Sequence, residues 1–269
     1  MIEKNQDFPN GREAFFVVVA LFAAEYLLGA AMYDMRAFLA LPEQDIGSMV
    51  TLLANGIVFT AVMHYKGLSY RDLFHSSPSS AGATLFVLTP VIALTIPALV
   101  VGMTAMCALL VQLFPISQWE AAMFEEMSSG SLGAIIGACI LAPVLEEMLF
   151  RGIILRSFLR QYSKWSAIVG SATLFGFAHM NLYQFAVGLV LGIVCGWLYE
   201  RTKSLLPCIV LHAAYNSALT VIDLQGSGMQ DGYANVSAFA WLAVLVFGTT
   251  GVVMLRRILE PGSPSSRGG

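Results

Sequence analysis

Three charged residues interrupt an apolar stretch that runs from about residue 131 to residue 162. They are Glu146, Glu147 and Arg151, in the segment APVLEEMLFRG. A charge at the centre of a bilayer costs about 2.5 to 3.5 kcal/mol, whereas one Leu or Val returns only a few tenths of that. We therefore expect these three side chains to face protein or enclosed water rather than lipid.

The spacing of the charges gives the two acids different surroundings. On a helix, Glu147 and Arg151 are four residues apart with the acid on the N-terminal side, which is the favourable order for an ion pair. Glu146 points about 100° away from Glu147 and has no local cation. A desolvated carboxylate without a cation partner is a stronger base, as a general base near neutral pH requires. The alternative interpretation is that these polar side chains are structural and hold the helices of the bundle together.

Two further polar pairs occur at helical spacing. Phe175 and His179 lie in LFGFAHM, and His212 and Asn216 lie in LHAAYN. At 1.5 Å per residue, the last three of these side chains fall at a depth similar to that of Glu146. A single buried histidine is more often structural, but four polar side chains from three helices at one depth favour a site, because lipid offers none of them a partner.

These residue types support hydrolysis. Glu146 would take a proton from water that His179 orients, and His212 and Asn216 would donate hydrogen bonds to the oxyanion of a tetrahedral intermediate. A zinc shell of Glu146, His179 and His212 is the alternative, although the HExxH helix of zinc peptidases is absent. We expect no metal and no cofactor.

Composition indicates an integral membrane protein. Of the 269 residues, 57% are hydrophobic and only 12% are charged, against about 25% charged residues in soluble domains. No basic tract is interleaved with aromatic residues, so we expect no nucleic-acid partner. The cysteines show no CxxC spacing and are interpreted as apolar packing residues; they are Cys107, Cys139, Cys195 and Cys208.

Hydropathy predicts an all-α polytopic membrane bundle of about eight transmembrane helices. The expected spans are 14–33, 46–64, 83–114, 131–160, 165–182, 184–200, 205–222 and 236–255. The predicted division of the chain is three N-terminal transmembrane helices in 1–130, the polar helix core in 131–222, a last transmembrane helix in 223–260 and a disordered tail in 261–269.

The basic residues predict the orientation of these spans. With a cytoplasmic N-terminus, 12 of the 14 lysines and arginines fall in cytoplasmic segments, Arg36 falls outside and Arg151 lies within the membrane. Both termini are therefore expected in the cytoplasm. The acidic segment 116–130 is expected to be a solvated loop, with an interfacial amphipathic segment as the alternative. Glu25, in the first span, is expected to hydrogen-bond between helices.

The three polar motifs resemble those of a known family. Glu146-Glu147-x-x-x-Arg151, Phe175-x-x-x-His179 and His212-x-x-x-Asn216, with Tyr-x-Arg-Thr-x-Ser at residues 199–204, are similar to the motifs of the CPBP family of intramembrane proteases. That family comprises type II CAAX prenyl proteases and bacteriocin-processing or immunity proteins. The resemblance covers about residues 131–220.

The resemblance implies a glutamate-type, metal-independent endopeptidase. Glu146 and His179 would activate water, His212 and Asn216 would form the oxyanion site, and Glu147, Arg151 and Phe175 would support them. We expect such an enzyme to lie in a bacterial cell membrane and to cut a membrane-associated peptide or protein reached from the cytoplasmic side. Two alternatives are a scaffold or immunity-type protein without turnover, which the intact set of catalytic-type residues disfavours, and a transporter, which the lack of inverted repeats disfavours.

Overall fold

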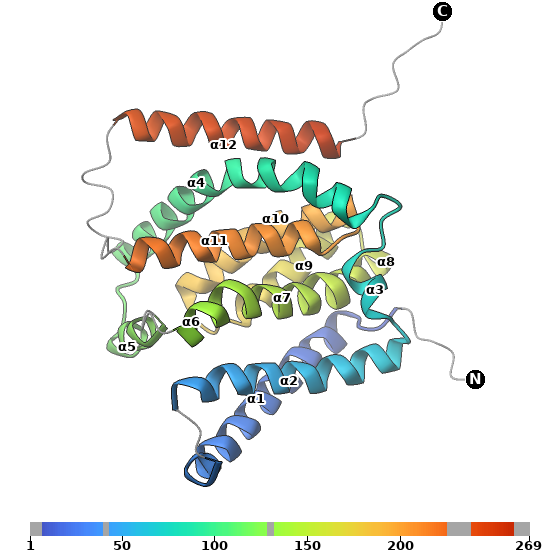
Figure 1. The fold of residues 1–269 in the computed structure, drawn as a ribbon, viewed down its shortest axis with the longest axis vertical. Helices are drawn as coiled ribbons and strands as arrows, with labels where there is room; N and C mark the ends of the chain where they lie inside the picture. The colour runs from blue at the N-terminus through green and yellow to red at the C-terminus, as the bar shows by residue number, and fades with distance from the viewer. Residues whose placement is uncertain (1–6, 40–42, 128–131, 225–237, 261–269) are drawn as a thin grey trace, which may run out of the picture.

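The structure, a computed structural model, describes residues 7–39, 43–127, 132–224 and 238–260. Within these ranges the chain is a bundle of helices without strands, and His75 and Ser204 form an isolated antiparallel bridge (Figure 1). The predicted all-α polytopic fold is confirmed, and the chain is an integral membrane protein. The predicted tail, 261–269, lies outside the described residues.

Twelve α-helices and two π-helical segments make up the described part of the chain. The α-helices are α1 Gly11–Leu39, α2 Glu43–Lys66, α3 Tyr70–Phe74, α4 Ala81–Leu113, α5 Gln118–Met127, α6 Leu132–Ile136, α7 Ala142–Glu147, α8 Arg156–Gln161, α9 Lys164–Phe177, α10 Leu182–Thr202, α11 Leu206–Leu224 and α12 Ala238–Leu259. The π-helical segments are η1 Gly137–Leu141 and η2 Met148–Leu155, which make Leu132–Gln161 one continuous membrane-length span.

Seven of the eight predicted spans are helices long and apolar enough to cross a membrane, counted over the described residues. The remaining one, predicted at 165–182, corresponds to α9, which has 14 residues. Such a helix rises about 21 Å, less than the roughly 30 Å of a hydrocarbon core. The chain turns back after α9 through Met180, whose φ is 52°. The turn is anchored at Asn181, which is 6% exposed, whereas Met180 itself is exposed.

The span Leu132–Gln161 lies in the middle of the bundle. Figure 1 shows α12 and α4 along one side and the α1–α2 hairpin along the other, with α9, α10 and α11 beside the central span. All eight residues of η2 are buried, including Arg151. Glu147 and Arg151 therefore face protein, as the cost of a charge in lipid predicts, whereas Glu146 is partly exposed.

Small residues let α9 and α10 approach closely. Gly188, Gly192 and Gly196 recur every four residues along α10, which is the pattern of tight helix contacts in membranes. A Cβ atom at Gly192 would lie 2.8 Å from the Cβ of Ala172 and 3.3 Å from Nη2 of Arg151. The contact between these two helices therefore depends on the missing side chain at Gly192.

We expect Gly192→Ala to lower the free energy of unfolding by about 1 to 3 kcal/mol, the usual cost of overpacking. The added methyl group would push α10 away from Ala172 and disturb Arg151. Thermal unfolding of the purified protein in detergent measures the effect. Gly102→Ala is the matched control, since a Cβ at Gly102 meets nothing within 4 Å. Equal melting temperatures for the two variants would contradict the prediction.

The acidic segment after α4 contains a helix, so the expectation of a loop throughout 116–130 is wrong. Residues Gln118–Met127 form α5, and 128–131 lie outside the described residues. The Ser117 hydroxyl accepts from the backbone N–H of Glu120 at 3.2 Å, and the Glu120 carboxylate accepts from the backbone N–H of Ser117 at 2.9 Å. This reciprocal pair is a capping box, and its S-x-x-E pattern was present in the sequence.

The predicted orientation leads to a test with topology reporters. A reporter fused at residue 228, which lies outside the described residues, is expected to report the external side, and one fused after the C-terminus the cytoplasmic side. The reason is that one membrane-length helix, α12, separates the two positions, and that Arg256 and Arg257 at its end favour the cytoplasm. Reporters that localise to the same side would contradict this topology.

Candidate active site

The predicted ion pair between Glu147 and Arg151 is confirmed. Arg151 Nη1 lies 3.0 Å from Glu147 Oε1, and the two side chains are 1% and 0% exposed. The guanidinium carbon also lies 4.4 Å from the centre of the Phe175 ring, a cation–π contact. Two polar atoms of the ion pair, Glu147 Oε2 and Arg151 Nη2, have no hydrogen-bond partner within the described part of the chain. The pair is thus fully buried and only partly satisfied.

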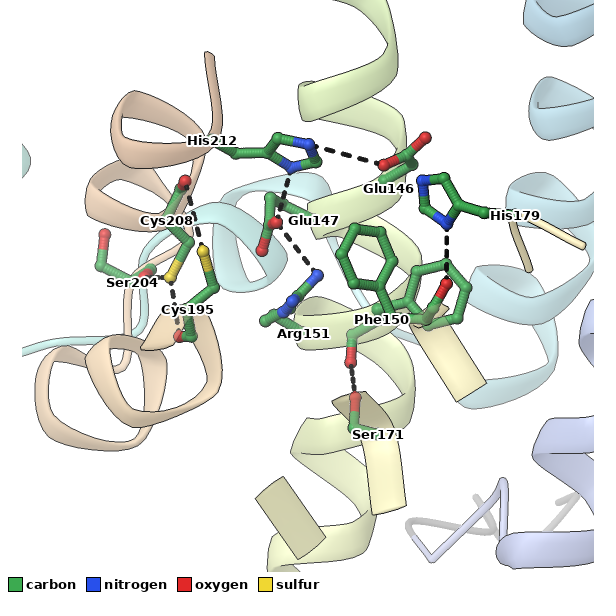
Figure 2. Close-up of polar contacts among 11 residues, drawn as sticks. Glu146, Glu147, Phe150, Arg151, Ser171, His179, Cys195, Ser204, Cys208 and His212 are labelled. Carbon is green, nitrogen blue, oxygen red and sulfur yellow. Dashed lines mark hydrogen bonds and ion pairs between the residues drawn. The ribbon is translucent and has the colours of Figure 1, made fainter. Parts of the chain in front are cut away.

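Glu147 also contacts His212 on α11. His212 Nδ1 lies 3.0 Å from Glu147 Oε1, while His212 Nε2 lies 3.7 Å from Glu146 Oε2 (Figure 2). An ionised carboxylate only accepts hydrogen bonds, so we assign the hydrogen of a neutral His212 ring to Nδ1. In that tautomer Nε2 carries no hydrogen and faces Glu146. Glu147 therefore orients the imidazole as well as neutralising Arg151.

The two adjacent acids differ in their access to solvent. The side chain of Glu146 is 30% exposed, whereas that of Glu147 is completely buried. Glu25 of α1 is half-buried and lies near enough to Glu146 for their charges to repel. This neighbour could not be predicted, because nothing in the residue spacing of α1 relates it to α7. Glu146 is therefore the more accessible of the two acids.

His179 and His212 pack against the same aromatic ring. The Phe175 ring lies edge-to-face with His179 at 5.1 Å between centroids and with His212 at 5.7 Å. His179 Nδ1 lies 3.0 Å from the Phe175 carbonyl oxygen and donates to it, which leaves Nε2 of a neutral ring as an acceptor. In the view of Figure 2 the Glu146 side chain lies between the two imidazoles. Phe175 thus sets the positions of both rings.

Asn216 lies one turn beyond His212 on α11 and points to the central span. Its Nδ2 donates to the carbonyl oxygen of Ala138 in η1 at 2.8 Å. Within the described residues it makes no hydrogen bond to Glu146, His179 or His212. An amide has two hydrogens, so this bond engages one of them and a second is left for another acceptor. The predicted oxyanion donor is therefore also an anchor for η1.

The π-helical segments on either side of α7 were not predicted. η1 ends just before α7 and η2 begins directly after Glu147. Such segments are rare and frequently occur at functional sites. From α9, the Ser171 hydroxyl donates to the carbonyl oxygen of Phe150 in η2 at 2.7 Å. A continuous apolar run carries no periodic signal that distinguishes a π-helical turn from an α-helical one.

The described residues contain no group of three or more His, Cys, Asp or Glu side chains arranged to hold a metal ion. In the alternative zinc shell, Glu146 and His212 would be two ligands, and their facing atoms lie 3.7 Å apart. His212 would bind through Nε2, since Nδ1 is engaged by Glu147.

Comparisons with known proteins match the part of the chain that carries this site. Residues 128–218 match the family model described as "Type II CAAX prenyl endopeptidase Rce1-like". "Putative membrane peptidase YdiL" of Bacillus subtilis (strain 168) is 30% identical over 91 residues, which are 34% of this chain and 37% of that protein. "UPF0177 protein YaiF" of Lactococcus lactis subsp. lactis (strain IL1403) is 32% identical over 90 residues, 33% of this chain and 40% of that protein.

No solved structure matches the chain. The matched segment spans less than half the length of the two curated relatives. Residues 128–218, which match the family model, contain all three polar motifs, from Glu146 to Asn216. The resemblance of this chain to the CPBP family, with an Rce1-like region at residues 128–218, is therefore confirmed.

Proposed function

We propose that the chain is an intramembrane endopeptidase of the glutamate type, which hydrolyses a peptide bond of a membrane-associated substrate. The observation that carries the proposal is the contrast between the adjacent acids. Glu146 is 30% exposed and faces His212 Nε2, while Glu147 is buried and paired with Arg151. One acid is thus accessible for chemistry, and the other holds the surrounding side chains in place. The Rce1-like region supports the same reading.

In the proposed reaction Glu146 acts first as a base and then as an acid. Its carboxylate removes a proton from a water molecule that also donates a hydrogen bond to Nε2 of His179. The resulting hydroxide forms a bond to the peptide carbonyl carbon, and the carbonyl π electrons move onto oxygen. When the C–N bond breaks, Glu146 returns its proton to the leaving nitrogen, so that a carboxylic acid and an amine are formed.

The contact between Glu147 and His212 places a condition on the oxyanion site. With its Nδ1 hydrogen directed to Glu147, a neutral His212 has no hydrogen on Nε2 to donate. Donation to the oxyanion therefore requires the doubly protonated ring. Glu147 Oε1 lies 3.0 Å from His212 Nδ1, and Arg151 binds the same oxygen. Asn216 supplies the second donor through its remaining amide hydrogen.

Peptide cleavage by the purified protein tests the proposal. The protein would be reconstituted into phospholipid vesicles and mixed with a library of quenched fluorescent peptides, half of which carry a C-terminal farnesyl group. We expect cleavage of at least one peptide class by the wild type and none above background by Glu146→Gln. Cleavage that survives in Glu146→Gln would refute the glutamate mechanism. Absence of cleavage of either peptide class would favour the scaffold or immunity-type alternative.

A further inference from the structure

The turn that carries His179 is attached to a helix outside the Rce1-like region. Asn181 begins α10, and its Oδ1 accepts from the backbone N–H groups of Tyr183 and Gln184 at 3.0 and 3.1 Å. Because Oδ1 is occupied as the acceptor, Nδ2 is the donor, and it lies 3.2 Å from Glu120 Oε1 in α5. Asn181 is only 6% exposed, whereas Glu120 is half-buried, so the bond reaches from the protein interior to its surface.

The backbone between Asn181 and His179 adopts a conformation that its own sequence does not favour. Met180 has a φ of 52°, in the left-handed region that side chains other than glycine rarely adopt. Such a conformation persists only where surrounding contacts hold it. The His179 ring is held on one side by Phe175, and the backbone that follows it depends on what fixes the chain at Asn181.

Glu120 is itself held in place and ionised. Its Oε2 accepts from the backbone N–H and the hydroxyl of Ser117 at 2.9 and 2.7 Å. These hydrogen bonds, first the one from the backbone N–H, lower the pKa of Glu120 below its ordinary value. The carboxylate is thus a preorganised acceptor for the Asn181 amide.

Two more contacts attach the α4–α5 region to the start of α10. The Tyr183 hydroxyl donates to the carbonyl oxygen of Phe114, at the end of α4. The Phe124 ring of α5 packs edge-to-face against the Tyr183 ring at 6.2 Å. Figure 1 shows α5 at the same end of the bundle as α6, which opens the central span. Together with the bond between Asn181 and Glu120, these contacts form an interface of three interactions between the α4–α5 region and the start of α10.

We propose that Glu120 is a positioning residue for His179, acting through Asn181 and the Met180 backbone. This inference rests on the proposed peptidase function. It assigns to α5, which precedes the matched residues 128–218, the task of holding the imidazole that orients the water. Glu120 touches neither substrate nor reacting atoms in this role.

A reversal of the hydrogen-bond polarity tests the proposal. Asn181→Asp keeps an oxygen to cap α10 but turns a second acceptor toward Glu120. We expect its kcat to fall about ten- to hundredfold, the effect of a catalytic group displaced by roughly 1 Å, with KM nearly unchanged. Adding Glu120→Gln supplies an amide donor to the new carboxylate, so the double variant is expected to recover most of the lost kcat. Gln118→Ala, an exposed position in the first turn of α5, is the matched control.

Hydrogen–deuterium exchange over residues 176–184 provides a readout that does not depend on catalysis. Exchange is expected to accelerate in Asn181→Asp and to return toward the wild-type rate in the double variant. A kcat that stays at the wild-type value in Asn181→Asp would overturn the positioning role, even if exchange changed. If the fall in kcat of the double variant equals the product of the falls in Asn181→Asp and in Glu120→Gln alone, the direct contact between the two side chains is overturned. A wild type that cleaves no peptide would remove the proposed function and the positioning role together, while exchange rescued in the double variant would show that the contact itself exists.

Discussion

Glu146→Gln is expected to abolish peptide cleavage while the bundle stays folded. The substitution keeps the shape of the side chain and removes only its ability to take a proton, so we expect kcat to fall by at least about 100-fold. The fold should tolerate the change because the side chain is 30% exposed and its polar neighbour, His212 Nε2, lies 3.7 Å away. The measurements are kcat on the peptide cleaved by the wild type and the melting temperature in detergent.

Glu147→Gln is the matched control for this prediction. It changes the neighbouring carboxylate in the same way, but it removes the negative charge from a pair that is 0% and 1% exposed. Breaking a buried ion pair from one side typically costs about 3 to 5 kcal/mol, because the other charge stays buried and unpaired. We therefore expect a clear fall in melting temperature, and some loss of activity because His212 loses a charged partner. Equal activities and equal melting temperatures for the two variants would contradict the division of roles.

The helices and the ion pair could be predicted because each depends on one local property. Hydropathy located the seven membrane-length helices of the described residues and the shorter α9, since a membrane segment is defined by its own composition. The pairing of Glu147 with Arg151 followed from helical spacing alone and is confirmed. The proximity of Glu146 to His212 followed from their equal depth in the membrane. Two side chains at the same depth can meet when their helices are neighbours.

Other features depend on the rotation and tilt of helices, which the sequence pattern does not specify. The bond between Glu147 and His212 requires α11 to present one particular face to the central span. The electrostatic effect of Glu146 on Glu25 likewise depends on where α1 lies relative to α7. The π-helical segments and the early end of α9 leave no mark in the periodicity of the apolar residues. For α5 the capping box at Ser117 and Glu120 was a usable local signal.

Asn216→Ala is expected to lower kcat by about 100- to 1,000-fold, equivalent to roughly 2.7 to 4 kcal/mol, with little change in KM. This is the usual consequence of losing one donor to an oxyanion. The structure adds a complication, since Asn216 also donates to the Ala138 carbonyl oxygen at 2.8 Å. A purely structural anchor would affect the melting temperature more than the rate.

Thr220 offers a control for that anchoring role. It lies one turn further along α11, and its hydroxyl contacts Cys139 Sγ of η1 at 3.4 Å. Thr220→Val therefore disturbs the same helix contact without removing the proposed donor. We expect it to retain wild-type kcat, whereas Asn216→Ala should not. A similar small loss of kcat in both variants would show that Asn216 only anchors η1.

The same assay separates the glutamate mechanism from the zinc alternative. If Glu146 is the base, the oxyanion donors carry a large share of the rate, and we expect strong chelators to leave the wild type active. If Glu146, His179 and His212 instead held zinc, the metal would generate the hydroxide and Asn216 would be peripheral. Elemental analysis of the purified protein, before and after chelation, decides between these mechanisms. Zinc bound at one equivalent, with activity lost on its removal and restored on its return, would establish the metallopeptidase mechanism in place of the glutamate one.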